Sequence, residues 1–330
     1  MRRIVPILVA AAMIISVSVV ILTDEDSAAV NEHGMYINGH EITDLIYHVD
    51  EGTEHWTYEF STGNLTIEAD SVFSSYCYID NGYETPASYG IYQGGGGGVN
   101  IILNGNLLIE GLSDEPGAER VGIYTVGEVT VSGSGKLTIK SASTEHHFNE
   151  GITANGSINI NSGTVEIHSG SDLYSIDGDF HMNGGELDLV GSGSATGESV
   201  YITGGTINID GSTGSTRNVV YAKGDHGATF DMTGGSINFA NCTSGQQLLY
   251  SISMWGSETL NLHGATGKNW VVHEDHFVDA VNDGPASITI NSSLYDEKKD
   301  LDDNIVIGVV AAVGVMAFAI LLLGFIGRKQ

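Results

Sequence analysis

Apolar and polar residues alternate along most of the chain in short segments, and a glycine opens many of these segments. An alternation with period two is typical of strands that bury one face, and glycine marks the turn before a strand. One five-residue phrase, glycine followed by polar, apolar, polar and apolar residues, recurs at intervals of 20 to 30 residues. It occupies 135–139, 163–167, 185–189, 205–209 and 235–239.

Each interval holds further short strands. One group places apolar residues two apart, at 129 and 131, 158 and 160, 180 and 182, 200 and 202, 230 and 232, 260 and 262, and 288 and 290. A less regular group opens with an apolar residue followed by tyrosine. Two or three short strands per repeat, with no helical stretch between them, predict a parallel β-helix. Because crossovers between parallel strands are right-handed, we expect a right-handed winding.

The predicted fold is therefore all-β: a right-handed, single-stranded parallel β-helix of about eight coils over residues 90–291. Residues 30–89 do not repeat, and we expect them to form an N-terminal cap, since open ends of a stack expose strand edges and core.

The two ends of the chain predict its location. Residues 1–29 combine two arginines, a long apolar run and small residues, which indicates a signal peptide or an uncleaved anchor. After a linker at 292–304, residues 305–326 carry no charge and are long enough to span a bilayer. Arg328 and Lys329 in the tail at 327–330 predict a cytoplasmic C-terminus. We expect a single-pass plasma-membrane protein with an extracellular β-helix.

The charge of the chain limits the classes of partner that it can bind. The formal net charge is −29, and such a surface repels nucleic acid and polyuronates. Asn-x-Ser/Thr sequons, which matter only in an exported domain, begin at Asn64, Asn155, Asn241 and Asn291. Chance occurrence in a chain rich in Asn, Ser and Thr explains these tripeptides equally well.

Several segments together carry a family resemblance: 56–58 running into 63–67, then 90–92, 106–111 and 122–124. Over roughly residues 35–291 the chain resembles the secreted or anchored proteins of anaerobic bacteria and archaea often labelled carbohydrate-binding domain-containing. These share the right-handed β-helix of the pectin-lyase-like superfamily. The resemblance implies that fold and a cell-surface setting, and it carries over no defined catalytic residue.

Tyrosines form the first candidate site. Each follows the apolar residue that opens a repeat, and stacked on one outer face they would make an aromatic strip that binds a glycan. The alternative is that they stabilise the ladder as cross-strand pairs. The residues are Tyr92, Tyr124, Tyr174, Tyr221 and Tyr250.

Carboxylates form the second candidate. Glu166 and Asp188 hold equivalent positions in adjacent repeats, where repulsion between like charges would raise one pKa, and Asp210 is diagonal to Asp188. These residues suit a glycan-active hydrolase, although solvated carboxylates on an acidic surface explain them as well. Another outward set, including Thr130 and Thr289, is expected to stabilise the stack. We expect no cofactor and no metal ion.

The function predicted from these observations is a membrane-anchored surface protein that binds or adheres to carbohydrate without catalysis. The hydrolase is the first alternative, and a structural surface spacer is the second.

Overall fold

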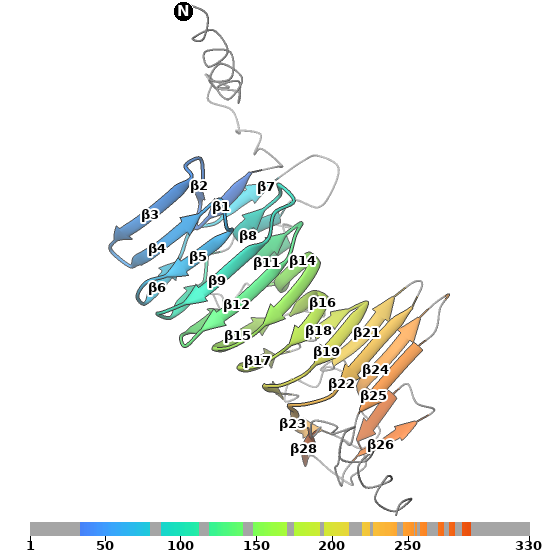
Figure 1. Ribbon diagram of the computed structural model, residues 1–330. Helices are drawn as coiled ribbons and strands as arrows, with labels where there is room; N and C mark the ends of the chain where they lie inside the picture. The colour runs from blue at the N-terminus through green and yellow to red at the C-terminus, as the bar shows by residue number, and fades with distance from the viewer. Residues whose placement is uncertain are drawn as a thin grey trace, which may run out of the picture.

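Parallel strands stacked in register make up most of the molecule. The computed structural model describes residues 34–79, 87–111, 119–140, 148–169, 175–191, 195–210, 220–224, 227–242, 247–253, 255, 258–262, 270–273, 277–280 and 286–291. This part of the chain contains strands and no helix, as the sequence predicts. Its sheets are rich in parallel pairs and consistent with a β-helix (Figure 1).

The strands of the stack form three ladders, and within a ladder each strand pairs with the next one along the stack. We call a level the set of three strand segments, one from each ladder, that follow one another along the chain. The first ladder comprises β8 (Ala87–Gln93), β11 (Glu119–Thr125), the start of β14 (Glu150–Ile160), the start of β16 (Ile176–Met182), β18 (Ala195–Gly197), β21 (Val220–Gly224) and β24 (Gln247–Ser253). The second comprises β5 (Asn64–Ile67), β9 (Val99–Leu103), β12 (Val129–Gly133), the ends of β14 and β16, β19 (Ser199–Ile202), β22 (Ala228–Met232) and β25 (Glu258–Leu262).

The third ladder contains the recurring phrase. It comprises β6 (Ser71–Phe73), β10 (Leu107–Ile109), β13 (Lys136–Ile139), β15 (Thr164–Ser169), β17 (Glu186–Gly191), β20 (Thr206–Asp210) and β23 (Ser236–Cys242). The glycine before four of these strands has a positive φ, between +74° and +81°, which side chains disfavour. This conformation explains why the phrase opens on glycine: the residues are Gly163, Gly185, Gly205 and Gly235.

The apolar positions of the alternation form the core. In the third ladder, Leu107, Leu137, Val165, Leu187, Ile207 and Ile237 occupy one register position and are at most 1% exposed. Burial of such side chains on neighbouring levels supplies the main driving force for folding. The polar residues between them point outward, so the sequence pattern separates core from surface as predicted.

Antiparallel strands close the two ends. At the N-terminal end these are β1 (Met35–Ile37), β2 (His40–Glu41), β3 (Ile46–Glu51), β4 (Glu54–Glu59) and β7 (Cys77–Ile79). At the other end they are β26 (Trp270–His273), β27 (Phe277–Ala280) and β28 (Ala286–Asn291). Antiparallel pairing at the ends covers strand edges that would otherwise be open.

Two predicted strand assignments differ from the structure. Asn64–Ile67 and Ser71–Phe73 already pair in parallel with the next level, so the stack begins inside the segment expected to be a cap. The strand containing Ile288 and Ile290 was expected beside Leu260 and Leu262, but β28 instead pairs antiparallel with β23 of the third ladder. Alternation reveals which face of a strand is buried and not the direction in which the strand runs.

No helix among the residues described is long and apolar enough to cross a membrane. The segments 1–29 and 305–326 lie outside the described residues, so the signal peptide and the membrane helix stay predictions.

Candidate functional site

The predicted tyrosine strip is interrupted and largely covered. Tyr92 is 7% exposed and Tyr221 is 4% exposed, so neither presents the open aromatic face that was expected. The rings of Tyr92 and Tyr124 stack 5.4 Å apart with an angle of 11° between them. Tyr36 of β1 packs against Tyr92, and Tyr89 packs against both rings. At this end of the first ladder the tyrosines are cross-strand packing partners, the alternative reading of the pattern.

The register shows where the tyrosine column stops. The position of Tyr124 is taken on the next levels by Thr153, Asp177 and Thr196, and tyrosine returns only with Tyr221 and then Tyr250. The level expected to contribute Tyr174 therefore has Asp177 in register. Tyr174 itself and the side chain of Tyr250 lie outside the described residues.

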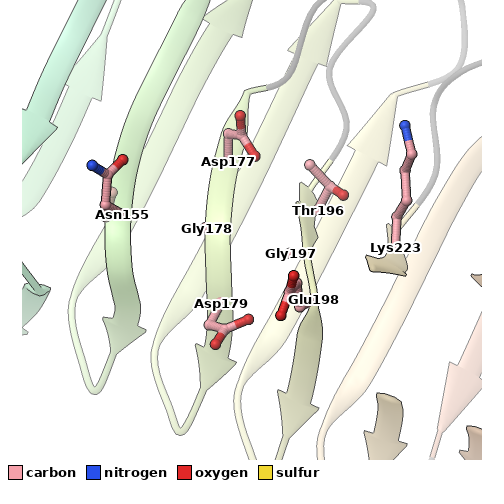
Figure 2. A pocket seen from close by; sticks show the side chains of 9 residues that line it. Asn155, Asp177, Gly178, Asp179, Thr196, Gly197, Glu198 and Lys223 are labelled. Atoms are coloured by element: carbon pink, nitrogen blue, oxygen red, sulfur yellow. The ribbon is translucent and has the colours of Figure 1, made fainter. Parts of the chain in front are cut away.

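A pocket lies along this interruption, and we call it the corner groove. It encloses about 480 Å³ where β14 and β16 bend from the first ladder into the second. Asn155, Asp177, Thr196 and Lys223 follow one another from strand to strand along it (Figure 2). Asp179 and Glu198 line it further along the strands. Short polar side chains in place of tyrosine leave the space that the groove occupies.

Glycines allow the strands to approach each other closely at the bend. A Cβ atom added to Gly197 would lie 2.2 Å from the carbonyl oxygen of Gly178 on the neighbouring level. Both glycines line the groove. The backbone therefore forms the floor there, and no side chain fits between the two levels.

Most polar side chains of the groove have no partner among the residues that the structure describes. Within the described residues, Asn155, Asp177, Thr196, Glu198 and Lys223 form no side-chain hydrogen bond or ion pair. The Thr196 side chain points into the groove although the residue is only 5% exposed. A buried hydroxyl without a partner costs free energy, which a bound polar ligand would recover.

The electrostatics of the groove centre on Asp177. Burial raises the pKa of Asp177, and the positive charge of Lys223 lowers it by less, so the net shift is upward. Burial likewise raises the pKa of the nearby Glu150, against a hydrogen bond from Thr153 Oγ1 to Glu150 Oε2 of 2.6 Å, and the Asp177 charge raises it further. The groove thus holds a partly buried carboxyl group whose pKa is raised.

The predicted carboxylate pair lies elsewhere, on the outer face of the third ladder. Glu166 and Asp188 are in register as expected. Lys136 Nζ contacts Glu166 Oε2 at 2.6 Å, and His168 Nε2 contacts Glu166 Oε1 at the same distance. Burial raises the Glu166 pKa, but these two partners together bring it below its ordinary value. The expected upward shift from repulsion between like charges is therefore wrong for Glu166.

Asp188 is held by its neighbour in the same column. Asn208 Nδ2 donates to Asp188 Oδ1 at 2.7 Å and to Glu186 Oε1 at 2.8 Å, and Asn238 Nδ2 donates to Asn208 Oδ1 at 2.8 Å. Thr289 Oγ1, from β28, completes the series with a bond of 2.9 Å to Asn238 Oδ1. Thr289 thus belongs to this column and not to the Thr130 column where it was predicted. The side chain of Asp210 lies outside the described residues.

The four sequons lie in different surroundings. Asn64 accepts a hydrogen bond from Asn100 Nδ2 at 3.2 Å, while Asn155 is exposed at the rim of the corner groove. The side chains of Asn241 and Asn291 lie outside the described residues. Among the residues with described positions, no group of three or more His, Cys, Asp or Glu is arranged to hold a metal ion.

One aromatic pair lies on the second ladder close to the groove. The rings of His181 and Tyr201 are 5.0 Å apart, on adjacent levels and two residues beyond Asp179 and Ser199 along their strands. Both rings are half-buried, and the Tyr201 hydroxyl has no partner among the described residues. The sequence indicated a structural role for this column, and the groove beside it was missed.

Comparison with known proteins adds no relative: no family model matches the chain, and neither a curated protein nor a solved structure is significantly similar to it.

Proposed function

We propose that this chain is a membrane-anchored cell-surface protein that binds carbohydrate in the corner groove. The proposal includes a right-handed β-helix of about eight coils, export through residues 1–29 and anchoring through residues 305–326. The resemblance to carbohydrate-binding surface proteins supports the same assignment. The binding residues differ from those that the tyrosine pattern predicts.

The observation that carries the proposal is a set of polar side chains around one pocket that form no side-chain hydrogen bond or ion pair within the described residues. Carboxylate, amide, hydroxyl and ammonium groups from successive levels line the groove, and within the described part of the chain these groups of Asn155, Asp177, Thr196, Glu198 and Lys223 have no side-chain partner. Sugars present many hydroxyl groups that both donate and accept hydrogen bonds. A site with a few placed polar groups in a preformed hollow is typical of small-ligand recognition. The buried Thr196 hydroxyl strengthens the argument, because it has no hydrogen-bond partner among the described residues and a bound ligand would supply one.

The nearby aromatic pair favours a sugar over other polar ligands. Aromatic rings pack against the C–H faces of sugar rings, and a tyrosine hydroxyl adds a hydrogen bond at the edge. Asp179 lines the groove, and His181, whose register partner is Tyr201, lies two residues or about 7 Å further along the same strand. An oligosaccharide that fills the groove can therefore extend one ring onto Tyr201 and His181.

Binding of the full chain to a glycan array tests the proposal. We expect selective binding to one class of glycans, and at least a tenfold loss of affinity in Asp177→Asn. Asp188→Asn is the matched control, because Asp188 is an outward aspartate already held by Asn208. An array without any bound glycan, or equal affinity in Asp177→Asn and the wild type, would overturn the assignment and leave a structural spacer.

A hydrolase acting through the same groove is the second candidate, and the raised pKa of Asp177 favours it. A carboxyl group that stays protonated at higher pH than usual can act as a general acid. Asp179 and Glu198 supply further carboxylates in the same pocket. Release of reducing sugar that disappears in Asp177→Asn while glycan binding persists would support this candidate, and its absence with a bound glycan would reject it.

A further inference from the structure

The charges of the corner groove limit the class of sugar that can bind there. This inference rests on the proposed function. Three carboxylates, from Asp177, Asp179 and Glu198, and one ammonium group, from Lys223, line the groove. When all four are ionised, negative charge exceeds positive charge by two. An anionic ligand such as a uronate or a sulfated sugar would be repelled there.

The ammonium group of Lys223 acts on the Asp177 carboxylate. Lys223 lowers the pKa of Asp177 through its charge, against the larger effect of burial. Asp179 accepts a hydrogen bond of 2.8 Å from the backbone N–H of Ser199, which follows Glu198 directly. This bond brings the Asp179 carboxylate to the peptide that links Glu198 to Ser199. Asp179 and Glu198 therefore lie near each other, and neither forms an ion pair within the described residues.

The remaining contacts of these carboxylates leave them open to a ligand. Glu198 is exposed and has no side-chain partner among the described residues. Its Cγ lies 3.4 Å from the position that a Cβ on Gly224 would take, so the side chain rests over β21, close to the backbone of Lys223. Asp179 accepts the Ser199 N–H with Oδ1, and its Oδ2 has no partner among the described residues.

A second, independent feature shows that the groove is more than an acidic cluster. Thr196 is 95% buried, points into the same pocket and has no hydrogen-bond partner within the described part of the chain. A hydroxyl group in that position accepts from an ammonium or hydroxyl donor and donates to a sugar oxygen. The groove thus combines a negative charge with a fixed, neutral hydrogen-bonding group, as recognition of a charged sugar requires.

We propose that the corner groove selects sugars with a protonated amine, with the ammonium group beside Asp179 and Glu198 and a ring hydroxyl at Thr196. An amino sugar carries both groups on one ring. Hydrogen bonds between an ammonium and a carboxylate are roughly twice as strong as neutral ones, so the amine distinguishes this ligand from a neutral sugar of the same shape.

A pair of ligands that differ only in this charge tests the proposal. Glucosamine oligomers and N-acetylglucosamine oligomers of equal length are titrated into the full chain at low ionic strength. We expect the free amine to bind at least tenfold more tightly, and the ratio of the two affinities to fall as salt is added. Glu198→Gln should reduce this ratio several-fold, whereas Glu186→Gln should leave it unchanged.

The Glu186 control separates groove binding from general attraction to an acidic protein. Glu186 is an exposed glutamate on the third ladder, where Asn208 already donates to it. Equal loss of the amine preference in both variants would mean attraction to the whole surface, and it would overturn the proposal. Equal or tighter binding of the acetylated oligomer would also overturn it while leaving carbohydrate binding intact. Binding of no glycan at all would instead reject the proposed function itself.

Discussion

The corner groove and the outer face of the third ladder contain the same kinds of polar residue. They differ in how many of these side chains form hydrogen bonds or ion pairs among the described residues. On the third ladder, Glu166 is held by Lys136 and His168, and Asp188 by Asn208. In the groove, Asp177 and Thr196 have no hydrogen-bond partner among the described residues. Polar side chains that bond to each other stabilise the stack, while those left unbonded around a hollow are available to a ligand.

The pKa shifts follow the same division. Burial dominates at Asp177 and raises its pKa, whereas the partners of Glu166 together outweigh burial and lower its pKa. A carboxylate in a column of the stack is therefore not informative by itself. What distinguishes a candidate site is a hollow beside the carboxylate and the absence of an internal cation or amide donor within bonding distance.

The largest expected effect comes from the backbone contact under the groove. Gly197→Ala should lower the free energy of unfolding by about 3 kcal/mol, because the new methyl group would meet the carbonyl oxygen of Gly178. Urea unfolding measures the change. Glu198→Ala, at the exposed neighbouring position, should stay within about 0.5 kcal/mol of the wild type. A Gly197→Ala protein as stable as the wild type would show that the two levels are further apart than the structure places them.

Next in size is the cost of breaking the bonded column. Asn208→Ala removes two donated bonds and one accepted bond, and it should lower the free energy of unfolding by about 2 kcal/mol. Asn155→Ala removes an exposed amide that has no partner among the described residues, and it should change stability by less than about 0.5 kcal/mol. Thermal and urea unfolding of the two variants compare them directly, and similar losses in both would contradict the proposed difference between the regions.

A smaller effect distinguishes binding from stability. Thr196→Val keeps the shape of a buried side chain that has no hydrogen-bond partner in the described part of the chain. Stability should therefore be unchanged or slightly higher, while affinity for the bound glycan falls about tenfold. Thr206→Val should do the opposite, because Thr206 Oγ1 lies 3.2 Å from Ser236 Oγ in the third ladder. Calorimetric titration and unfolding of both variants measure the two quantities. Unaltered affinity in Thr196→Val would remove this hydroxyl from the site.

The smallest expected effect is on the pH dependence of stability. A raised pKa in the folded state means that Asp177 destabilises the fold increasingly as pH rises from its ordinary value, about 3.9, to its folded value. A lowered pKa means that Glu166 stabilises the fold above its ordinary value, about 4.3, and that this stability is lost as pH falls through the folded value.

The two variants should therefore change stability in opposite directions. At neutral pH, Asp177→Asn should be more stable than the wild type and Glu166→Gln less stable, each by less than about 1 kcal/mol, since both groups are partly solvated. Both differences should shrink in acid. Urea titrations at a series of pH values test this, and shifts of the same sign in both variants would contradict the assignment of burial to one site and pairing to the other.

Much of the fold is predictable because the recurring phrase contains the residues that form its turns and its buried core. Glycine at 163 and 185 permits the positive φ of the turn, and the apolar residues that follow, such as Val165 and Leu187, are buried as the alternation requires. Strand direction is not encoded in this way. The segment containing Ile288 and Ile290 shows the same alternation, yet it runs antiparallel and closes the third ladder.

The candidate site was not predictable from the same phrase, because its residues lie where the repeat is weakest. Thr196 and Gly197 belong to β18, a strand of three residues that lacks the apolar-tyrosine opening. The only signal in the sequence was an absence: tyrosine missing from three successive levels between Tyr124 and Tyr221. Whether a tyrosine is exposed depends on its neighbours, and Tyr92 is covered by side chains from β1 and β8 that the repeat does not include.

Successive levels each contribute residues to the groove. The number of levels along the groove therefore sets the length of the ligand that it can hold. Each level adds about 4.8 Å to the stack, so a groove built from consecutive levels grows or shrinks in steps of that size. Duplication of one coil with a small polar residue at the Thr196 position would lengthen the groove without disturbing the core. Replacement of that residue by tyrosine would close one step of it. Proteins built in this way can change the length of the ligand they accept through gain or loss of whole repeats, without a change in any individual contact.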